Sequence, residues 1–170
     1  MEFLELAKAR YSVRKFSDKP IEEEKINKIL EAGRLAPTAK NEQPQKIFVL
    51  KSDEAIRKIR ENTSNTYNAP IVFLICYDKN KCWKNPDTGF ESGIMDASIV
   101  CTSMMMEATD LLLGSIWILR FDKDLVKRQF ELPENIVPCC LLPIGYAAEC
   151  CEPSERHFER KDLKDTVIEL

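Results

Sequence analysis

The spacing of apolar residues along the chain predicts helices that alternate with strands. Over residues 2–10, apolar side chains recur at the spacing of one helix face. A second helical segment follows the helix-start sequence Asp18-Lys19-Pro20 and repeats apolar positions at i, i+3, i+4 and i+7. Those positions are Ile26, Ile29, Leu30 and Gly33. Pro37 predicts that this helix ends near Leu35, because the residue before a proline avoids helical dihedrals.

Continuous apolar runs predict the strands, and capping residues predict the helices between them. The expected strands are residues 47–50, 71–77, 115–119 and 137–146. Ser52-Asp53 starts one further helix, and residues 122–130 form another. Helices and strands in this order predict an α+β domain, with a mixed sheet flanked by helices.

Two segments are candidates for contact with a second copy of the chain. Residues 92–113 predict a long helix that is apolar all round, which favours either a central core helix or packing against a second copy of the chain. Residues 147–170 are mostly charged and hold too few apolar residues for a core of their own. We expect them to form a C-terminal tail that extends over the domain or over a partner subunit.

Composition narrows the class of protein. A chain of 170 residues, 44 % hydrophobic and 31 % charged, predicts one globular domain over residues 1–170. A net charge of −3 argues against nucleic acid as a partner. No apolar run reaches the roughly 18 residues of a membrane span, and no signal peptide is recognisable, so we expect a cytoplasmic protein without a membrane partner.

The seven cysteines predict buried thiols. Their number is odd, no Cys-x-x-Cys is present, and most lie in apolar runs. The adjacent pairs Cys139-Cys140 and Cys150-Cys151 leave a metal site as the less favoured alternative, because neighbouring strand residues face opposite sides. We therefore expect no metal.

Residues 10–16 hold the first candidate binding site. If this segment is extended, Arg10, Ser12 and Arg14 point the same way, because side chains alternate along a strand. Two guanidinium groups and one hydroxyl suit a phosphate, which offers three acceptor oxygens and nearly two negative charges. A solvated basic stretch is the alternative.

Two further segments carry polar groups outside the predicted core. The loop over residues 36–44 brings Thr38, Asn41 and Gln43 between two prolines, and amides that both donate and accept suit the edge of a heterocycle. Ordinary turn chemistry is the alternative there. A second basic cluster spans residues 156–161, which alternatively is a solvated tail.

The sequence lacks the residues that two other kinds of enzyme site require. None of the five glycines forms a Gly-x-Gly-x-x-Gly loop, which argues against a Rossmann nicotinamide site. His157 is the single histidine and lies in the charged tail, which argues against a Ser-His-Asp triad.

Taken together, the motifs resemble the nitroreductase family of flavin mononucleotide (FMN) enzymes over most of the chain. The order is Arg-x-Ser-x-Arg-x-Phe from residue 10, Ala-Pro-Thr-x-x-Asn-x-Gln-Pro from residue 36, residues 141–146, and a terminal Arg-Lys. Residues 96–118 look like the family's long dimer-interface helix and the strand after it.

The resemblance implies a homodimer with two FMN sites at its interface and a role for particular residues. Arg10, Ser12 and Arg14 would hold the phosphate and ribityl chain, helped by Arg160 and Lys161. The loop that reaches the flavin often comes from the partner subunit in this family. The residues implied at the flavin ring are Thr38, Asn41 and Gln43 from the loop, the backbone of Ile118 and Leu119 beside N5, and Gly145 nearby.

The chain departs from the family pattern at four places. Gln45 stands where a Trp is usual, Thr38 replaces a common Ser, and Leu112-Leu113-Gly114 replaces Gly-Leu-Gly. These three are compatible with FMN binding. Leu119 replaces a flexible Gly near flavin N5, and it could narrow the pocket, which leaves the substrate range open.

The resemblance therefore implies an FMN-dependent oxidoreductase that moves hydride from NADH or NADPH through flavin N5 to an electron-poor acceptor. A nitroaromatic or a quinone would be such an acceptor, in a ping-pong cycle. No side chain need act as a catalytic group, because the cofactor carries the redox chemistry. Three alternatives stay open: a flavin-binding protein with little turnover, a specialised relative acting on one metabolite or on flavin itself, and a thiol or zinc protein.

Overall fold

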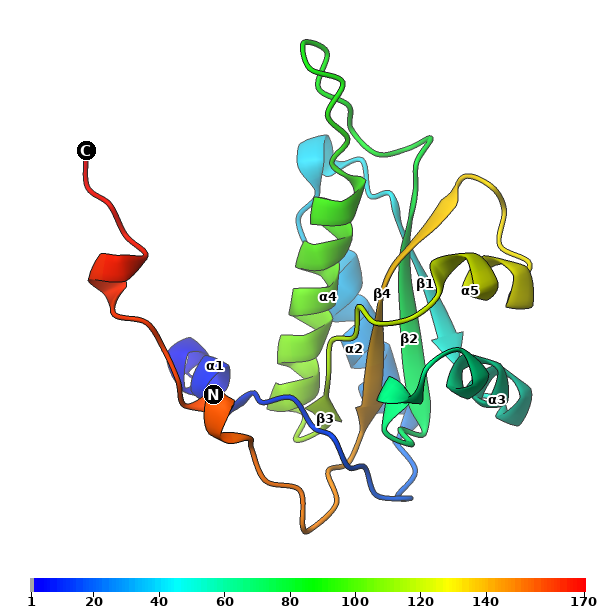
Figure 1. Cartoon of the computed structure of the whole chain (residues 1–170), viewed down its shortest axis with the longest axis vertical. Helices are drawn as coiled ribbons and strands as arrows, with labels where there is room; N and C mark the ends of the chain where they lie inside the picture. Colours follow the sequence, from blue (N-terminus) through cyan, green and yellow to red (C-terminus); the bar gives the residue numbers. More distant parts are fainter. Residues whose placement is uncertain (1) are drawn as a thin grey trace.

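The computed structural model describes residues 2–170 and shows an antiparallel sheet between two layers of helices (Figure 1). The strands are β1 (Gln45–Leu50), β2 (Ile71–Asp78), β3 (Gly114–Ser115) and β4 (Ile136–Gly145), in the order β1-β2-β4-β3. The α-helices are α1 (Phe3–Ala9), α2 (Glu23–Leu35), α3 (Asp53–Asn62), α4 (Gly93–Asp110) and α5 (Lys123–Gln129). Short 3₁₀ turns are η1 (Ala39–Asn41), η2 (Ser64–Thr66), η3 (Glu155–His157) and η4 (Leu163–Asp165).

The expected α+β class is confirmed, and the sheet is antiparallel between all its named strands. Its parallel component is an isolated bridge between Ser12 and Ser115, where the N-terminal segment meets β3. This segment also donates from Val13 N–H to the Ser115 carbonyl (3.0 Å) and from Ser17 N–H to the Tyr146 carbonyl (2.8 Å). Residues 12–17 are therefore held in extended form along the ends of β3 and β4.

Strand β2 lies at the centre of two hydrophobic cores. Every residue of β2 is buried, and its side chains alternate between the two faces of the sheet. Phe73 and Ile75 pack in the core formed with α2 and α4, whereas Val72 and Leu74 pack in the core formed with α3 and α5. The continuous apolar run over 71–77 is explained by this burial on both faces.

Helix α4 is buried on one face only. Ala97, Val100, Cys101, Met104 and Ala108 are fully buried against the sheet and α2. The opposite face exposes Ile94, Met95 and Ile99, at 59 %, 60 % and 41 % of their surface. Of the two alternatives for this helix, burial on every side does not hold within the single chain, because the sheet and α2 cover one face only. The other face is open to a partner.

Local signals predict most helix boundaries correctly. The Ser52 hydroxyl accepts from Ala55 N–H (3.2 Å) at the start of α3, and the Asp122 carboxylate accepts from Leu125 N–H (2.9 Å) at the start of α5. Helix α2 ends at Leu35 as Pro37 predicts. Its start, Glu23, lies three residues beyond Pro20, and its preceding residue gives no side-chain cap.

Two predicted strands are less regular in the structure. Over the expected strand 115–119, regular pairing covers Gly114–Ser115 and an isolated bridge joins Ile118 to Leu141, while between them Ile116 N–H still donates to the Pro143 carbonyl (3.3 Å), so the segment runs beside β4 with incomplete pairing. Strand β4 continues through Pro138 and Pro143, and a register shift opposite Ile75 and Cys76 accommodates the irregularity. The long helix ends at Asp110, and Leu112 takes a left-handed backbone with φ of 61°.

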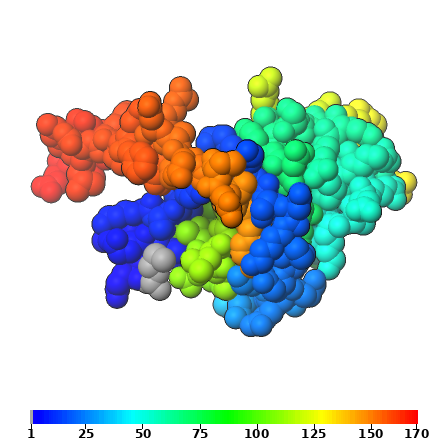
Figure 2. All heavy atoms as spheres, turned by 90° about the horizontal axis from the view of Figure 1, so that it is seen from below, coloured from blue at the N-terminus to red at the C-terminus, as the bar shows by residue number. Residues whose placement is uncertain are grey.

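The C-terminal tail leaves the body beside the N-terminal segment. Ala148 N–H donates to the Lys15 carbonyl (3.0 Å), and the Tyr11 hydroxyl donates to the Cys151 carbonyl (3.1 Å). Figure 2 shows these two parts of the chain, dark blue and orange, side by side on one face, with the red end projecting away from the body. Among the helices that the structure describes in residues 2–170, none is long and apolar enough to cross a membrane.

Candidate functional site

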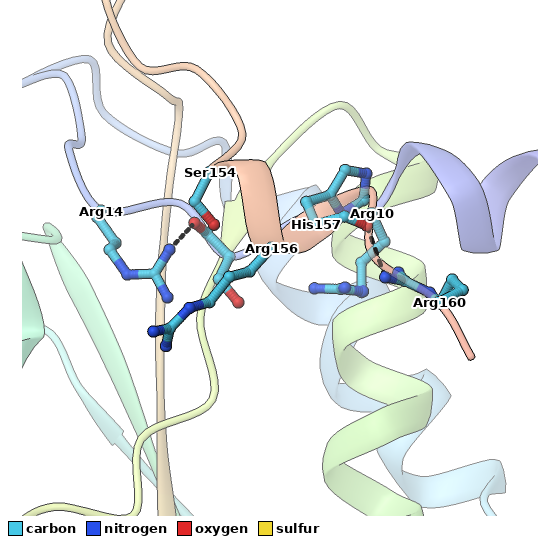
Figure 3. Close-up of a pocket in the computed structure, with 7 residues that line it drawn as sticks. Arg10, Arg14, Ser154, Arg156, His157 and Arg160 are labelled. Atoms are coloured by element: carbon cyan, nitrogen blue, oxygen red, sulfur yellow. Dashed lines mark hydrogen bonds between the residues drawn. The ribbon is translucent and has the colours of Figure 1, made fainter.

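Two segments from opposite ends of the sequence form a cavity of about 180 Å³ (Figure 3). We call it the basic cavity. Its lining residues are Arg10, Ser12, Arg14, Ser154, Arg156, His157 and Arg160. The structure thus brings together the three residues predicted at the N-terminus and one of the two predicted in the tail.

The N-terminal wall is positioned by the residue between its members. Val13 is buried and packs on the backbone of Gly114, where an added Cβ would lie 2.5 Å from a Val13 methyl carbon. Because adjacent residues of an extended segment point to opposite sides, burying Val13 directs Ser12 and Arg14 outward. The alternation that the sequence predicted is therefore present, and Gly114 is required for the close approach.

The other wall comes from the tail. The turn η3 carries Arg156 and His157, and the His157 ring meets the Tyr11 ring edge-on with centroids 6.2 Å apart. Ser154, Arg156 and His157 were not predicted as ligands, although the last two lie in the basic cluster that the sequence analysis identified. Lys161 is exposed and lies outside the lining.

The charge of the basic cavity favours an anion. Its lining contains four guanidinium groups and no carboxylate. Burial, and then the positive charge of Arg160, lower the pKa of Arg10. Arg14 Nη1 donates to the Ser12 carbonyl at 3.3 Å, which leaves most of its donors available to a ligand. Guanidinium forks with serine hydroxyls beside them fit the phosphate of FMN.

The loop with Thr38, Asn41 and Gln43 lies elsewhere, at the N-terminal end of α4. Ala39 N–H donates to Asp96 Oδ1 (2.8 Å), and the Ser92 hydroxyl donates to Asp96 Oδ2 (2.6 Å). Asp96 is 2 % exposed, so this carboxylate is a buried anchor for the loop. Sequence analysis missed it, although an acidic residue in the first turn of an otherwise apolar helix was a usable signal.

The loop itself has a strained but bonded backbone. Asn41 and Gln43 have φ of 57° and 48°, in the left-handed region, and so does Lys40 at 49°. The Thr38 hydroxyl accepts from Gln43 N–H (3.0 Å), and Gln43 Nε2 donates to the Asn41 carbonyl (3.2 Å). All three predicted loop residues thus belong to one preformed unit, and the Asn41 and Gln43 side chains are exposed.

One chain does not bring this loop to the basic cavity. Val13, in the N-terminal wall, packs at Gly114, just beyond the C-terminal end of α4, whereas the loop is anchored in its first turn. Helix α4 has 18 residues, which corresponds to a length of about 27 Å at 1.5 Å per residue. The two groups of predicted residues therefore lie about one helix length apart (Figure 1).

Leu119 lines a second hollow of about 520 Å³, on the side of α3. The hollow is formed by residues 62–65 and 119–122. Hydrogen bonds join these segments: among them, the Thr63 hydroxyl donates to the Arg120 carbonyl (2.9 Å), and Asp122 N–H donates to Asn62 Oδ1 (2.8 Å). Leu119 is 68 % exposed, and within residues 2–170 no acceptor is found for its N–H.

Ile118 and Gly145 are both buried. Ile118 pairs with Leu141 on β4 through two backbone hydrogen bonds. A Cβ at Gly145 would lie 2.8 Å from the Phe16 ring and 2.9 Å from Pro70, so packing alone requires this glycine. Gly145 lines neither of the two cavities.

Comparison with known proteins identifies the family. The sequence model described as the nitroreductase family matches residues 7–68 and 61–146, which include the N-terminal wall of the basic cavity, the loop and α4. The chain belongs to the nitroreductase family, a family of oxidoreductases. The resemblance stated from the sequence motifs is confirmed.

Solved structures support the same assignment. A nitroreductase family protein from Clostridium difficile 630 superposes with a TM-score of 0.93 and 41 % identity, covering 99 % of this chain and 98 % of that one. An FMN-dependent nitroreductase from Clostridium difficile R20291 superposes with a TM-score of 0.73 and 28 % identity, covering 86 % and 88 %.

A relative from another organism agrees with this assignment. This protein, from Methanothermobacter thermautotrophicus, bears the name NADH dehydrogenase/NAD(P)H nitroreductase. It is 32 % identical over 94 % of this chain and 88 % of its own length.

Proposed function

We propose that this nitroreductase is an FMN-dependent oxidoreductase that uses NADH or NADPH to reduce an electron-poor acceptor, such as a nitroaromatic or a quinone. The observation that carries the proposal is the basic cavity, in which four guanidinium groups converge without a carboxylate. FMN, when bound, supplies the hydride chemistry, so the protein needs residues that bind, orient and protect it rather than a side-chain nucleophile.

In this proposal the basic cavity holds the FMN phosphate. Arg10, Ser12 and Arg14 are the primary ligands, because Ser12 and Val13 are fixed against β3 and Arg10 caps α1 directly before them. Arg160 completes the cavity from the tail. Lys161, exposed beside Arg160, adds positive charge near the phosphate.

We propose a homodimer built on the exposed face of α4. Ile94, Met95 and Ile99 form an apolar strip on a helix whose first turn anchors the loop. A two-fold axis across α4 would place the first turn of one helix beside the last turn of the other. Thr38, Asn41 and Gln43 of one protomer would then reach the flavin whose phosphate the other protomer binds.

The remaining predicted contacts follow from this arrangement. The Leu119 N–H is available as a donor to flavin N5, with the backbone held in place by the pairing of Ile118 with Leu141. Gly145 would lie near the same flavin. The tail would extend over the partner, because Leu163, Val167, Ile168 and Leu170 are exposed in the single chain.

The test begins with the absorbance spectrum of the purified protein and identification of any cofactor released on denaturation. We expect flavin bands, FMN at about one per chain, rapid bleaching by NADH or NADPH without oxygen, and reoxidation by a nitroaromatic. A colourless protein that takes up no added FMN would overturn the proposal.

A second candidate is a flavin-binding protein with little turnover. The observation in its favour is Leu119, a bulky apolar residue that lines the hollow beside residues 62–65 and would narrow it. The same experiment separates the two functions, because a binder would contain FMN that stays oxidised for minutes with either nicotinamide.

A further inference from the structure

The two walls of the basic cavity differ in how firmly the chain holds them. The N-terminal wall is bonded to β3 and β4. Beyond Cys151, each hydrogen bond described in residues 152–170 has both partners inside that stretch. The described contact between residues 152–170 and the body of the protein is the edge-on approach of the His157 ring to the Tyr11 ring.

The tail is also poorly buried where it forms the second wall. No residue from 152 to 170 is buried. Arg160 Nη1 donates to the His157 carbonyl at 2.6 Å (Figure 3) and to the Glu159 carbonyl at 2.6 Å, and so to its own segment. Neither hydrophobic burial nor hydrogen bonding therefore fixes residues 152–170 against the N-terminal wall.

Electrostatic repulsion between the two walls opposes closure of the basic cavity by protein groups alone. Arg10 and Arg14 on one wall face Arg156 and Arg160 on the other, with no carboxylate in the lining. The salt bridges described within residues 2–170 involve other arginines, Arg34 and Arg57. Like charges at close range repel, and the closed cavity contains no protein group that could neutralise them.

We propose that a phosphomonoester dianion is the bridge that closes residues 152–170 of the tail over the basic cavity. A phosphate offers three acceptor oxygens and close to two negative charges, enough to accept from both walls at once. Ordering of the tail is then part of ligand binding, as in segments that fold on association. This inference rests on the proposed function and adds a conformational consequence to it.

The closure also determines where the apolar end of the tail lies. Leu163, Val167, Ile168 and Leu170 follow directly after the cavity residues and are exposed in the single chain. A bound phosphate holds the start of this segment in one place, and therefore restricts where its apolar end can reach. Occupancy of the basic cavity is thus coupled to the position of the last residues of the chain.

Trypsin provides a direct readout, because Arg156, Arg160, Lys161 and Lys164 all lie in this part of the tail. The full-length protein, freed of any bound FMN, is digested briefly with no addition, with inorganic phosphate, with FMN or with riboflavin. Cleavage after Arg156 and Arg160 is followed by mass spectrometry. Riboflavin matters because it carries the flavin ring without the phosphate.

We expect cleavage at these sites to slow about tenfold with phosphate or FMN at ten times the dissociation constant of each, because only open chains are cut. Riboflavin should leave the rate unchanged. Three results would overturn the inference: equal protection by riboflavin, no protection by FMN that is bound, or a tail already resistant without a ligand.

Substitutions in each wall test whether both walls are needed for phosphate to protect the tail from trypsin. Arg156→Ala removes a guanidinium group from an exposed position on the tail, so the body should fold normally while protection by inorganic phosphate, read at Arg160 because the site after residue 156 is gone, is lost. Arg14→Ala removes one from the opposite wall and should have the same effect. Arg57→Ala, on the exposed face of α3, is the matched control and should keep full protection. Protection that survives both cavity variants would contradict the proposal.

Failure of this inference can be distinguished from failure of the proposed function. The phosphate experiment requires neither flavin nor turnover, so closure by inorganic phosphate would stand even if the protein bound no FMN. Conversely, a protein that holds FMN and bleaches with NADPH, yet shows the same tail cleavage with and without FMN, would retain its function and refute the inference.

Discussion

Single side chains determine the ligand chemistry of the basic cavity, and Arg14 is the most direct to test. It is exposed and donates one described hydrogen bond, to the Ser12 carbonyl. Arg14→Ala should therefore leave stability nearly unchanged but weaken FMN binding by about 1.5–3 kcal/mol, or roughly 10- to 150-fold, as for loss of a charged hydrogen bond. Titration of apo-protein with FMN measures this, with Arg57→Ala as control. Unchanged affinity would remove Arg14 from the site.

Cys150 differs chemically from the buried thiols. Lys15 Nζ donates to Cys150 Sγ at 2.9 Å, and this bond lowers the pKa of the exposed Cys150 thiol. Burial instead raises the pKa of Cys139 to about 12, and it also raises the pKa of Cys76. The Cys150 thiolate should therefore be present at lower pH than an ordinary thiolate, whereas the Cys76 and Cys139 thiols stay protonated.

Iodoacetamide should accordingly label the folded protein fastest at Cys150, with a rate that rises through a pH midpoint below that of a free cysteine. Lys15→Met should move the midpoint upward, whereas Lys28→Met, at an ion-paired position on α2, should not. Peptide mass spectrometry over a pH series measures both. Faster labelling at Cys151, or a midpoint insensitive to Lys15, would disprove the assignment.

At the scale of elements, the first turn of α4 holds the loop that carries Thr38, Asn41 and Gln43. Asp96 accepts from Ala39 N–H and from the Ser92 hydroxyl, and both donors lose their partner in Asp96→Ala. The free energy of unfolding should fall by about 1–3 kcal/mol, and FMN affinity should fall as well, because the loop is released. Asp96→Asn retains the Oδ1 acceptor and is the matched control.

Urea unfolding and FMN titration of both variants test this role. If Asp96→Ala loses stability but binds FMN as the wild type does, Asp96 anchors α4 without positioning the loop for the ligand. Sequence analysis predicted the loop chemistry but not this anchor, because the contact joins residues separated by 57 positions.

At the scale of the whole molecule, the distance between the loop and the basic cavity makes the dimer testable by complementation. Arg14→Ala damages the phosphate part of each site, and Gln43→Ala damages the loop part. If each FMN site combines the cavity of one protomer with the loop of the other, a mixed dimer has one doubly damaged site and one intact site.

Mixing the two variants under conditions that exchange subunits should therefore restore about one tight FMN site per mixed dimer, measured by FMN titration. Each variant alone serves as the control and should show only weakened sites. Absence of any tight site, with exchange confirmed by mass spectrometry, would mean that the cavity and the loop of the same chain serve one ligand.

Local sequence determined the features that depend on neighbouring residues. Helix starts at Ser52 and Asp122 and the helix end before Pro37 follow from capping and proline sterics. The shared direction of Arg10, Ser12 and Arg14 follows from alternation along an extended backbone. The order of these motifs also identified the family. Such features needed no knowledge of distant contacts.

Tertiary structure alone decided which distant segments meet. The sequence did not show that Ser154, Arg156 and His157 join Arg10 in one cavity, that the loop lies a helix length away from it, or that α4 is open on one face. The segment expected as a strand over 115–119 does run beside β4, but which of its residues complete the ladder depends on the position of β4. The periodicity of apolar residues predicts the conformation of one segment and which of its faces is buried. Which segments then pack together depends on contacts and charges between residues far apart in the sequence, and no single segment contains that information.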